Sequence, residues 1–247
     1  MIPSSKCFMQ ISNERRDRMS LMLAPSIMCA DLLHMEDEIK ELEKGGADFI
    51  HYDIMDTTFT TQTMLPFCMI PRIQSITAIP LDIHLMIDRP ERILDKLLPY
   101  CKDTYIGIHV EVTKEITSLF SSIHAAGGKC CAILNAGTSI HCLEEILPYI
   151  DMVNLILGNA GFCARQPLNE QLLLKIRNTR SLLDSCDRSI LLEVDGGVSP
   201  EVAEKAKQAG ANVFVLGTKS IYQPDCIASQ ECIKFRRNLE AGQSRSV

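Results

Sequence analysis

Histidines and aspartates recur in alternation at the ends of several apolar runs of this chain. The residues of each pair stand two positions apart: His51 and Asp53, Asp82 and His84, Glu193 and Asp195. Within a β-strand, such a pair faces one side. Imidazoles and carboxylates that point inward from different strands are costly to bury unless a metal ion binds them. The spacing therefore predicts a divalent metal centre.

Two neutral imidazoles and two carboxylates suit zinc, and they would also bind iron(II), manganese or cobalt. We predict one such ion per subunit, with the ligands His51, Asp53, His84 and Asp195. The alternative is that a neighbouring backbone or side-chain group satisfies each polar residue, as is usual for a single inward histidine. Because four such residues fall on three strand ends, we favour the metal.

Two carboxylates beside a metal suggest inversion of a carbon atom next to a ketone. Removal of that proton needs a base, and the resulting enediolate needs electrostatic stabilisation, which a metal supplies. Asp53 and Asp195 fall on the second and seventh apolar runs, about three strands apart around a closed barrel. One can then remove the proton while the other returns it to the opposite face. We predict these two residues as the catalytic pair.

Glycines follow the last two apolar runs, at Gly196-Gly197 and at Gly217-Thr218. In α/β barrels, the loops at these positions commonly bind phosphate through backbone N–H groups and a helix N-terminus, and Ser199-Pro200 is typical of such a helix start. The alternative is that the glycines only turn the chain. Their presence after both strands favours phosphate binding.

Four further candidate substrate-binding residues each have two interpretations. Met55 and Met86 continue the inward alternation and would form an apolar wall that excludes water, or simply fill the core. His109 ends the fourth run, where it would contact substrate or serve the structure. Ser26 ends the first run, where it would bind a sugar hydroxyl or cap a helix. These alternatives stay open.

Apolar runs alternate regularly with amphipathic stretches. Strands are predicted over 23–27, 49–54, 80–86, 104–109, 130–134, 152–157, 190–194 and 213–216. Helices are predicted over 31–44, 66–75, 114–126, 143–150, 169–184 and 200–209. This alternation indicates an α/β fold, a single (β/α)8 TIM barrel. An open doubly wound sheet is less suitable, since no Gly-x-Gly-x-x-Gly turn follows the first strand.

Length, charge and cysteine content limit the classes of protein to which this chain can belong. The 247 residues suit one barrel domain, which we place at 21–240 after a polar extension over 1–20. A net charge of −6 without a basic block argues against nucleic acid, and no apolar run approaches the roughly 20 residues of a membrane span. The 11 cysteines lack paired spacing, and the chain starts without an export signal, so we expect reduced thiols and a cytoplasmic protein.

At these residues the chain resembles the ribulose-phosphate 3-epimerase family, which includes allulose-6-phosphate 3-epimerases. The matching pieces lie between about Leu21 and Tyr222: Ala24-Pro-Ser-Ile, Gly46 to Asp56, Pro80 to Met86, Leu134-Asn135, Asn159 to Phe162, Glu193 to Gly197 and Gly217-Thr218. The resemblance implies a metal-dependent barrel of the ribulose-phosphate-binding type. Its implied substrate is a phosphorylated ketose, which Ser26 and glycine loops, Gly161 included, would hold.

Two segments depart from that family pattern. After Asp56 the family usually continues Gly-His-Phe-Val-Pro-Asn, whereas this chain has Thr57-Thr-Phe-Thr-Thr-Gln62. After the sixth strand it usually reads Met-Thr-Val-Asn-Pro-Gly-Phe-Gly-Gly-Gln, and here the stretch runs from Ile156 to Arg165 with Cys163-Ala in place of the Gly-Gly pair. The metal and acid/base set is intact, so the reaction type is better defined than the ketose phosphate.

Two other functions compete with C3 epimerisation of a ketose phosphate. A phosphate-binding barrel decarboxylase would need a lysine in an Asp-x-Lys-x-x-Asp run, which Asp53-Ile-Met-Asp56 lacks. A non-catalytic sugar-phosphate-binding barrel is the remaining alternative, although all four ligand positions are filled. We also expect a homo-oligomer, either a dimer or a hexamer, with apolar helices such as 143–150 available for contacts.

Overall fold

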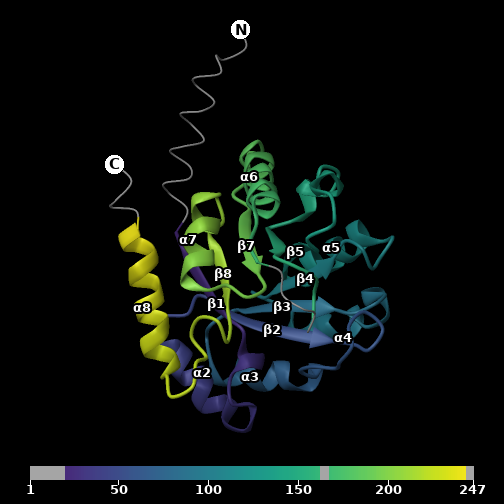
Figure 1. The fold of residues 1–247 in the computed structure, drawn as a ribbon. Helices are drawn as coiled ribbons and strands as arrows, with labels where there is room; N and C mark the ends of the chain where they lie inside the picture. Colours follow the sequence, from purple (N-terminus) through teal and green to yellow (C-terminus); the bar gives the residue numbers. More distant parts are fainter. Residues whose placement is uncertain (1–19, 162–166, 243–247) are drawn as a thin grey trace.

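Eight parallel strands form the centre of the molecule, and helices surround them (Figure 1). The computed structural model describes residues 20–161 and 167–242. The strands are β1 (Met22–Pro25), β2 (Ile50–Met55), β3 (Leu81–Met86), β4 (Tyr105–His109), β5 (Lys129–Leu134), β6 (Met152–Ile156), β7 (Leu191–Asp195) and β8 (Val213–Leu216). Their spatial order is β1-β8-β7-β6-β5-β4-β3-β2. A parallel bridge between Ser26 and His51 joins β1 to β2, so the barrel is nearly closed.

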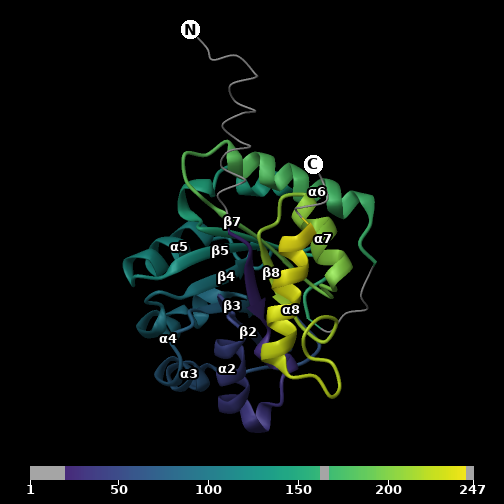
Figure 2. The same ribbon diagram turned by 90° about the vertical axis from the view of Figure 1, so that its left-hand side faces the viewer.

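The α-helices lie outside the strands. They are α2 (Met35–Lys44), α3 (Ile70–Ile76), α4 (Leu94–Leu97), α5 (Ile116–Ala125), α6 (Glu170–Asp184), α7 (Pro200–Gln208) and α8 (Ala228–Ala241). Figure 2 shows α8 beside α7 and α2, which it contacts. Because α8 packs on α2, the last helix completes the ring next to the first strand. The predicted (β/α)8 barrel is confirmed.

Short 3₁₀ turns occupy several connections: η1 (Ile27–Cys29), η2 (Leu32–His34), η3 (Phe67–Met69), η4 (Pro90–Arg92), η5 (Leu98–Tyr100), η6 (Ile140–Leu143) and η7 (Leu147–Tyr149). The helix predicted over 143–150 is wrong, because η6 and η7 stand there. Pro148 lacks an N–H donor, and its ring would clash with a preceding helical turn. Leu143 and Ile146 are buried, so this segment is not the exposed apolar helix that we expected for oligomer contacts.

Two apolar cores hold the barrel. The larger lies between the strands and the helices and includes Tyr52, Phe120 and Phe214. The smaller fills the barrel with residues such as Phe49 and Met152, which share the inward alternation of the predicted site residues. Polar residues of the same parity therefore project into the barrel above this apolar floor.

Other expectations concern the termini, the cysteines and membranes. The predicted extension lies outside the described residues except for Ser20, as does the departing segment Cys163-Ala-Arg165 with Phe162 before it. Within the described ranges, the eight cysteines other than Cys186 are free thiols. No helix in the described parts of the chain has the length and hydropathy that a membrane span requires.

Candidate metal centre and active site

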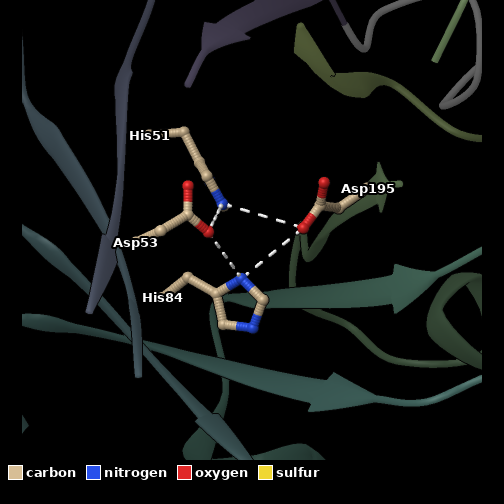
Figure 3. Close-up of side chains that lie close together, drawn as sticks. All are labelled: His51, Asp53, His84 and Asp195. Atoms are coloured by element: carbon tan, nitrogen blue, oxygen red, sulfur yellow. Dashed lines mark ion pairs between the residues drawn. The ribbon is translucent and has the colours of Figure 1, made fainter. Parts of the chain in front are cut away.

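Four side chains converge inside the barrel, His51 and Asp53 from β2, His84 from β3 and Asp195 from the carboxyl end of β7 (Figure 3). Asp53 Oδ1 lies 3.3 Å from His51 Nε2 and 3.4 Å from His84 Nδ1. Asp195 Oδ2 lies 3.5 Å from His84 Nδ1 and 3.8 Å from His51 Nε2. The structure thus brings together the four residues that the alternation selected, from strands up to 144 positions apart in sequence (195 − 51).

The donor set fits a divalent metal ion. His51 Nε2 and His84 Nδ1 are buried and have no hydrogen-bond partner, although both face the two carboxylates. Zinc–ligand bonds of about 2.0–2.1 Å in a tetrahedron place neighbouring ligand atoms about 3.3–3.4 Å apart. The nitrogen–oxygen separations of 3.3 to 3.8 Å are close to that spacing. An ion between the four atoms would satisfy both unpaired nitrogens.

A carboxylate behind His51 determines which of its nitrogens faces the centre. Asp82 Oδ2 lies 2.5 Å from His51 Nδ1, and both side chains are buried. With the proton on Nδ1, the Nε2 lone pair points between Asp53 and Asp195. Burial opposes protonation of His51, but the Asp53 and Asp82 carboxylates outweigh it and hold the pKa of this imidazole well above its ordinary value.

Asp53 is ionised in spite of its burial. Desolvation would raise the pKa of its carboxyl, but His51 and His84 outweigh that effect and lower the pKa below its usual range. Ser26 Oγ also donates a hydrogen bond of 2.6 Å to Asp53 Oδ2. That bond leaves Oδ1 facing the two imidazoles. Ser26 therefore orients a carboxylate of the centre, a contact that the sequence interpretation did not include.

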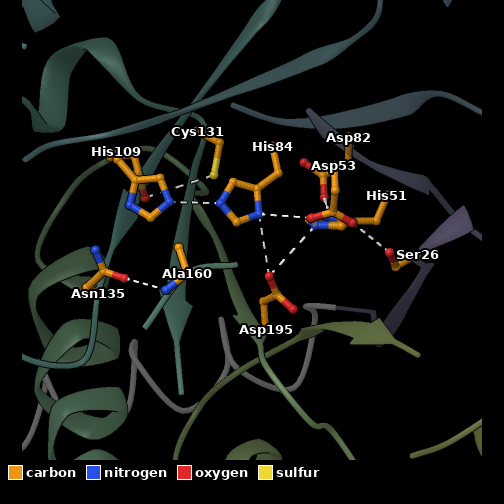
Figure 4. A network of polar contacts seen from close by, with 11 residues as sticks. Ser26, His51, Asp53, Asp82, His84, His109, Cys131, Asn135, Ala160 and Asp195 are labelled. Atoms are coloured by element: carbon orange, nitrogen blue, oxygen red, sulfur yellow. Dashed lines mark hydrogen bonds and ion pairs between the residues drawn. The ribbon is translucent and has the colours of Figure 1, made fainter. Parts of the chain in front are cut away.

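His84 is backed by a second histidine. Its Nε2 lies 2.8 Å from His109 Nε2 (Figure 4). His109 Nδ1 lies 3.1 Å from Glu111 Oε2. Burial lowers the pKa of His109 to about 4 despite its hydrogen bond to Glu111. Burial would raise the pKa of Glu111, but hydrogen bonds from His109 and Thr138 outweigh it and lower that pKa to about 2. The arrangement therefore pairs a neutral imidazole with an ionised carboxylate.

Below the centre, Glu193 and Asn154 stand side by side on β7 and β6. Both are completely buried, and their side-chain polar atoms have no hydrogen-bond partner. Burial and the neighbouring Asp82 raise the pKa of Glu193 well above its ordinary value. Glu193 shares the parity of Asp195, as predicted, but it lies deeper in the barrel.

The pocket above the centre contains most of the predicted residues. Its lining includes Ser26, Asp53, Met55, His84, Met86, Gly161, Asp195, Gly196, Gly197 and Gly217. His51, His109 and Thr218 are not part of that lining. His51 and His109 lie beneath it, and the Thr218 carbonyl accepts a hydrogen bond of 2.8 Å from Gln223 Nε2.

The glycine loops around the pocket have backbone conformations that other residues rarely adopt. Gly196 and Gly197 have φ angles of 106° and 71°.

Ser199 caps α7 as predicted, because its Oγ accepts a hydrogen bond from Val202 N–H at 3.2 Å. The β2 loop reaches the same pocket: a side chain added at Gly161 would meet Thr60 at about 3.0 Å. The departing segment 57–62 therefore borders the site.

Sequence reasoning missed three contributors. Asp82 was recognised as an inward polar residue without a role, and Glu111 was not selected, although their spacing of two from His84 and His109 was the available signal. Lys219 was not selected. It lines the pocket two residues after Gly217 and, among the described residues, forms no ion pair.

Comparison with known proteins decides the family. The model of the ribulose-phosphate 3-epimerase family matches residues 22–221. The chain belongs to the ribulose-phosphate 3-epimerase family. A ribulose-phosphate 3-epimerase of Bacillus subtilis is 34% identical over 206 residues, 83% of this chain and 94% of that protein. Another, from Buchnera aphidicola, is 34% identical over 230 residues, 91% and 97% of the two chains.

Solved structures agree on the fold. A tryptophan synthase α-subunit from Pyrococcus furiosus superposes with a TM-score of 0.65 at 15% identity, over 90% of this chain and 98% of that one. A thiamine phosphate pyrophosphorylase from the same organism gives 0.58 at 13% identity, over 92% and 98%. At such identities the likeness concerns the barrel alone. The family membership shows that this chain is an isomerase, a carbohydrate epimerase.

Proposed function

We propose that this epimerase inverts C3 of a ketose phosphate, with ribulose 5-phosphate and xylulose 5-phosphate as the favoured pair. The observation that carries the proposal is the position of Asp53 and Asp195. They come from β2 and β7, and they face each other across two unpaired imidazole nitrogens at the floor of one pocket. Relatives that are named ribulose-phosphate 3-epimerase support the substrate.

The two carboxylates divide the proton transfer between them. One takes the C3 proton from one face of the ketose, and an enediolate forms. The other then delivers a proton to the opposite face, and the carbon is inverted. In the reverse direction, Asp53 and Asp195 exchange these roles. The lowered pKa of Asp53 keeps its carboxyl ionised at the start of the direction in which it acts as the base.

The metal would be held by His51, Asp53, His84 and Asp195. When bound, a divalent ion would polarise the carbonyl and offset the negative charge that develops on the substrate oxygens. Two nitrogen and two oxygen donors suit zinc, while iron(II), manganese and cobalt share these preferences. We propose one ion per subunit.

Apolar side chains exclude water from the reacting carbon. Met55 and Met86 line the pocket directly above the ligands of their own strands, and Ile156 lines it from β6. Because a carbanionic intermediate would pick up protons from bulk water, this wall favours transfer by the two carboxylates. The methionines therefore belong to the pocket rather than to the core alone.

The phosphate group would lie over the loops after β6, β7 and β8. Gly161, Gly196, Gly197 and Gly217 line this part of the pocket, where backbone N–H groups can approach an anion closely. Lys219 is the single lysine or arginine among the described lining residues. Since Asp53 and Asp195 repel an anionic substrate, Lys219 supplies a compensating positive charge. Thr218 stands between Gly217 and Lys219 in the same turn.

The substrate is tested with a panel of ketoses. Metal-loaded protein is incubated separately with ribulose 5-phosphate, xylulose 5-phosphate, allulose 6-phosphate and unphosphorylated ribulose, and epimers are quantified by NMR. We expect interconversion of the two pentulose phosphates and at most slow turnover of ribulose. Turnover of allulose 6-phosphate alone would reassign the substrate. Binding of every phosphate without any turnover would instead support the non-catalytic sugar-phosphate-binding barrel.

A further inference from the structure

His84 and His109 share one contact that restricts where their protons can be. The two Nε2 atoms lie 2.8 Å apart, and both side chains are almost completely buried (Figure 4). At that distance a single proton lies between them, because two N–H groups would repel and two lone pairs would form no bond. One histidine therefore donates and the other accepts.

The opposite nitrogen of each ring decides the direction. His84 Nδ1 faces Asp53 and Asp195 at 3.4 and 3.5 Å, and it must be unprotonated to bind an ion there. The His84 proton is then on Nε2, and His109 Nε2 accepts it. His109 in turn carries its own proton on Nδ1, which faces Glu111 Oε2 at 3.1 Å. Along the row from His84 through His109 to Glu111, each N–H donor therefore faces an acceptor.

We propose that His109 and Glu111 are positioning residues that fix the tautomer and the ring orientation of His84 for metal binding. This inference rests on the metal centre in the proposed function. It also gives His109 a place different from the substrate contact that the sequence suggested, because His109 does not line the pocket. The ring of Phe59 lies 4.7 Å from the His109 ring, between centroids, and limits its rotation from another side.

Glu111 is itself anchored to the loop after β5. Its Oε1 accepts a hydrogen bond of 2.9 Å from Asn135 N–H and another from the Thr138 hydroxyl. Lys175 holds the same loop from α6, with Nζ donating to the carbonyls of Asn135 and Thr138 at 2.6 and 2.8 Å. The row of hydrogen bonds therefore ends on fixed backbone, and His84 cannot turn without breaking it.

The loop also connects this row with the substrate pocket. Asn135 Oδ1 accepts a hydrogen bond of 2.8 Å from Ala160 N–H, and Ala160 lines the pocket (Figure 4). Thr138 touches Glu111 but no residue of the metal centre. A Thr138→Val variant therefore loosens the loop while the direct contacts of His109 remain.

Two substitutions at His109 separate hydrogen-bond polarity from packing. In His109→Gln, the amide oxygen can accept from His84 and the amide nitrogen can donate to Glu111, whereas His109→Leu keeps bulk and removes both bonds. Affinity for cobalt(II) and zinc is measured by competition with a chelator, and the cobalt(II) absorption spectrum reports the ligand geometry. His34→Leu is the control, since His34 pairs with Asp31 outside the centre.

We expect His109→Leu to weaken metal binding about 10- to 100-fold and to alter the cobalt spectrum, as loss of an outer hydrogen bond does at other metal sites. His109→Gln should restore most of the affinity, and Glu111→Gln should fall between the two. Wild-type affinity and spectrum in a folded His109→Leu protein would overturn the inference, and so would equal losses in folded Leu and Gln variants.

If His109→Leu does not fold, the comparison of Glu111→Gln with wild type decides, and unchanged metal affinity there would overturn the inference. These measurements need no turnover. A wild-type protein that binds metal with the predicted variant order, yet epimerises no ketose phosphate, would contradict the proposed reaction and leave the role of His109 supported. A wild-type protein that binds neither zinc nor cobalt would overturn this inference together with the metal centre.

Discussion

Replacement of Asp82 isolates the carboxylate that stands behind His51. Asp82 Oδ2 and His51 Nδ1 are 2.5 Å apart, and their side chains are 2% and 1% exposed, so water cannot substitute for the lost partner. Metal binding at Nε2 forces the His51 proton onto Nδ1. In Asp82→Ala that N–H has no acceptor, whereas the metal-free protein can move the proton to Nε2, next to Asp53. The cost therefore falls on the metal-bound form.

An unsatisfied buried donor costs about 1–3 kcal/mol, which corresponds to roughly 5- to 150-fold weaker metal binding. Asp82→Asn keeps a carbonyl oxygen as acceptor but loses the charge, so the loss should be about 1 kcal/mol, or about fivefold. The expected order of affinity is wild type, then Asn, then Ala.

Zinc affinity is measured by competition with a chelator, and circular dichroism confirms the fold of each variant. Asp48→Ala is the control, because Asp48 pairs with Arg236 at 2.6 Å and accepts a hydrogen bond from Leu23 N–H, away from the centre. It should lower thermal stability without a change in zinc affinity. A folded Asp82→Ala variant that binds zinc within about twofold of wild type would refute the reasoning about the His51 tautomer.

Three other predictions concern catalysis, substrate charge and metal removal. Asp53→Asn and Asp195→Asn should each reduce epimerisation at least about 100-fold, since each removes one partner of the proton transfer, and activity in both variants would contradict the two-carboxylate reaction. Lys219→Met should raise KM for a ketose phosphate about three- to tenfold with little change in kcat. Lys205→Met on α7 is the control and should change neither constant. An unchanged KM in Lys219→Met would exclude Lys219 from phosphate binding. Chelation should lower Tm by about 5–10 °C, because zinc at about 100 times its Kd contributes about 2.7 kcal/mol; equal Tm values with and without chelator would argue against the metal centre.

The barrel could be predicted because its signals are local. Period-two alternation, apolar strands and glycine or proline at helix ends gave all eight strands and most helices within a few residues. The helix expected over 143–150 does not form. The apolar spacing suggested a helix there, but Pro148 has no backbone N–H to donate within one, and two 3₁₀ turns form instead. The short α4 and the long α8 were not predicted. In α8, buried Cys232 and Phe235 pack beside exposed Ile233, which blurs the helical pattern.

The four convergent residues could also be predicted, since parity and strand-end position select them. The same spacing marks Asp82 and Glu111 as inward residues, but it does not show which side chains they contact. The contact of His84 with His109 depends on the register of β3 with β4, where His84 pairs with Gly107 and His109 lies two residues further along β4. Lys219 lies in the turn after β8, and hydrophobic periodicity does not show which way a side chain in such a turn points. Contacts between neighbouring strands and loops are thus properties of the assembled barrel.

In the proposed reaction, Asp53 and Asp195 exchange the C3 proton of a ketose phosphate on opposite faces. It is tested most directly by incubation of metal-loaded protein with ribulose 5-phosphate in deuterated water, with C3 followed by NMR. Solvent deuterium should enter C3 of both epimers, and Asp53→Asn and Asp195→Asn should each prevent interconversion. Epimerisation without any deuterium at C3 under prolonged incubation, or no exchange in a protein shown to bind metal and substrate, would contradict it.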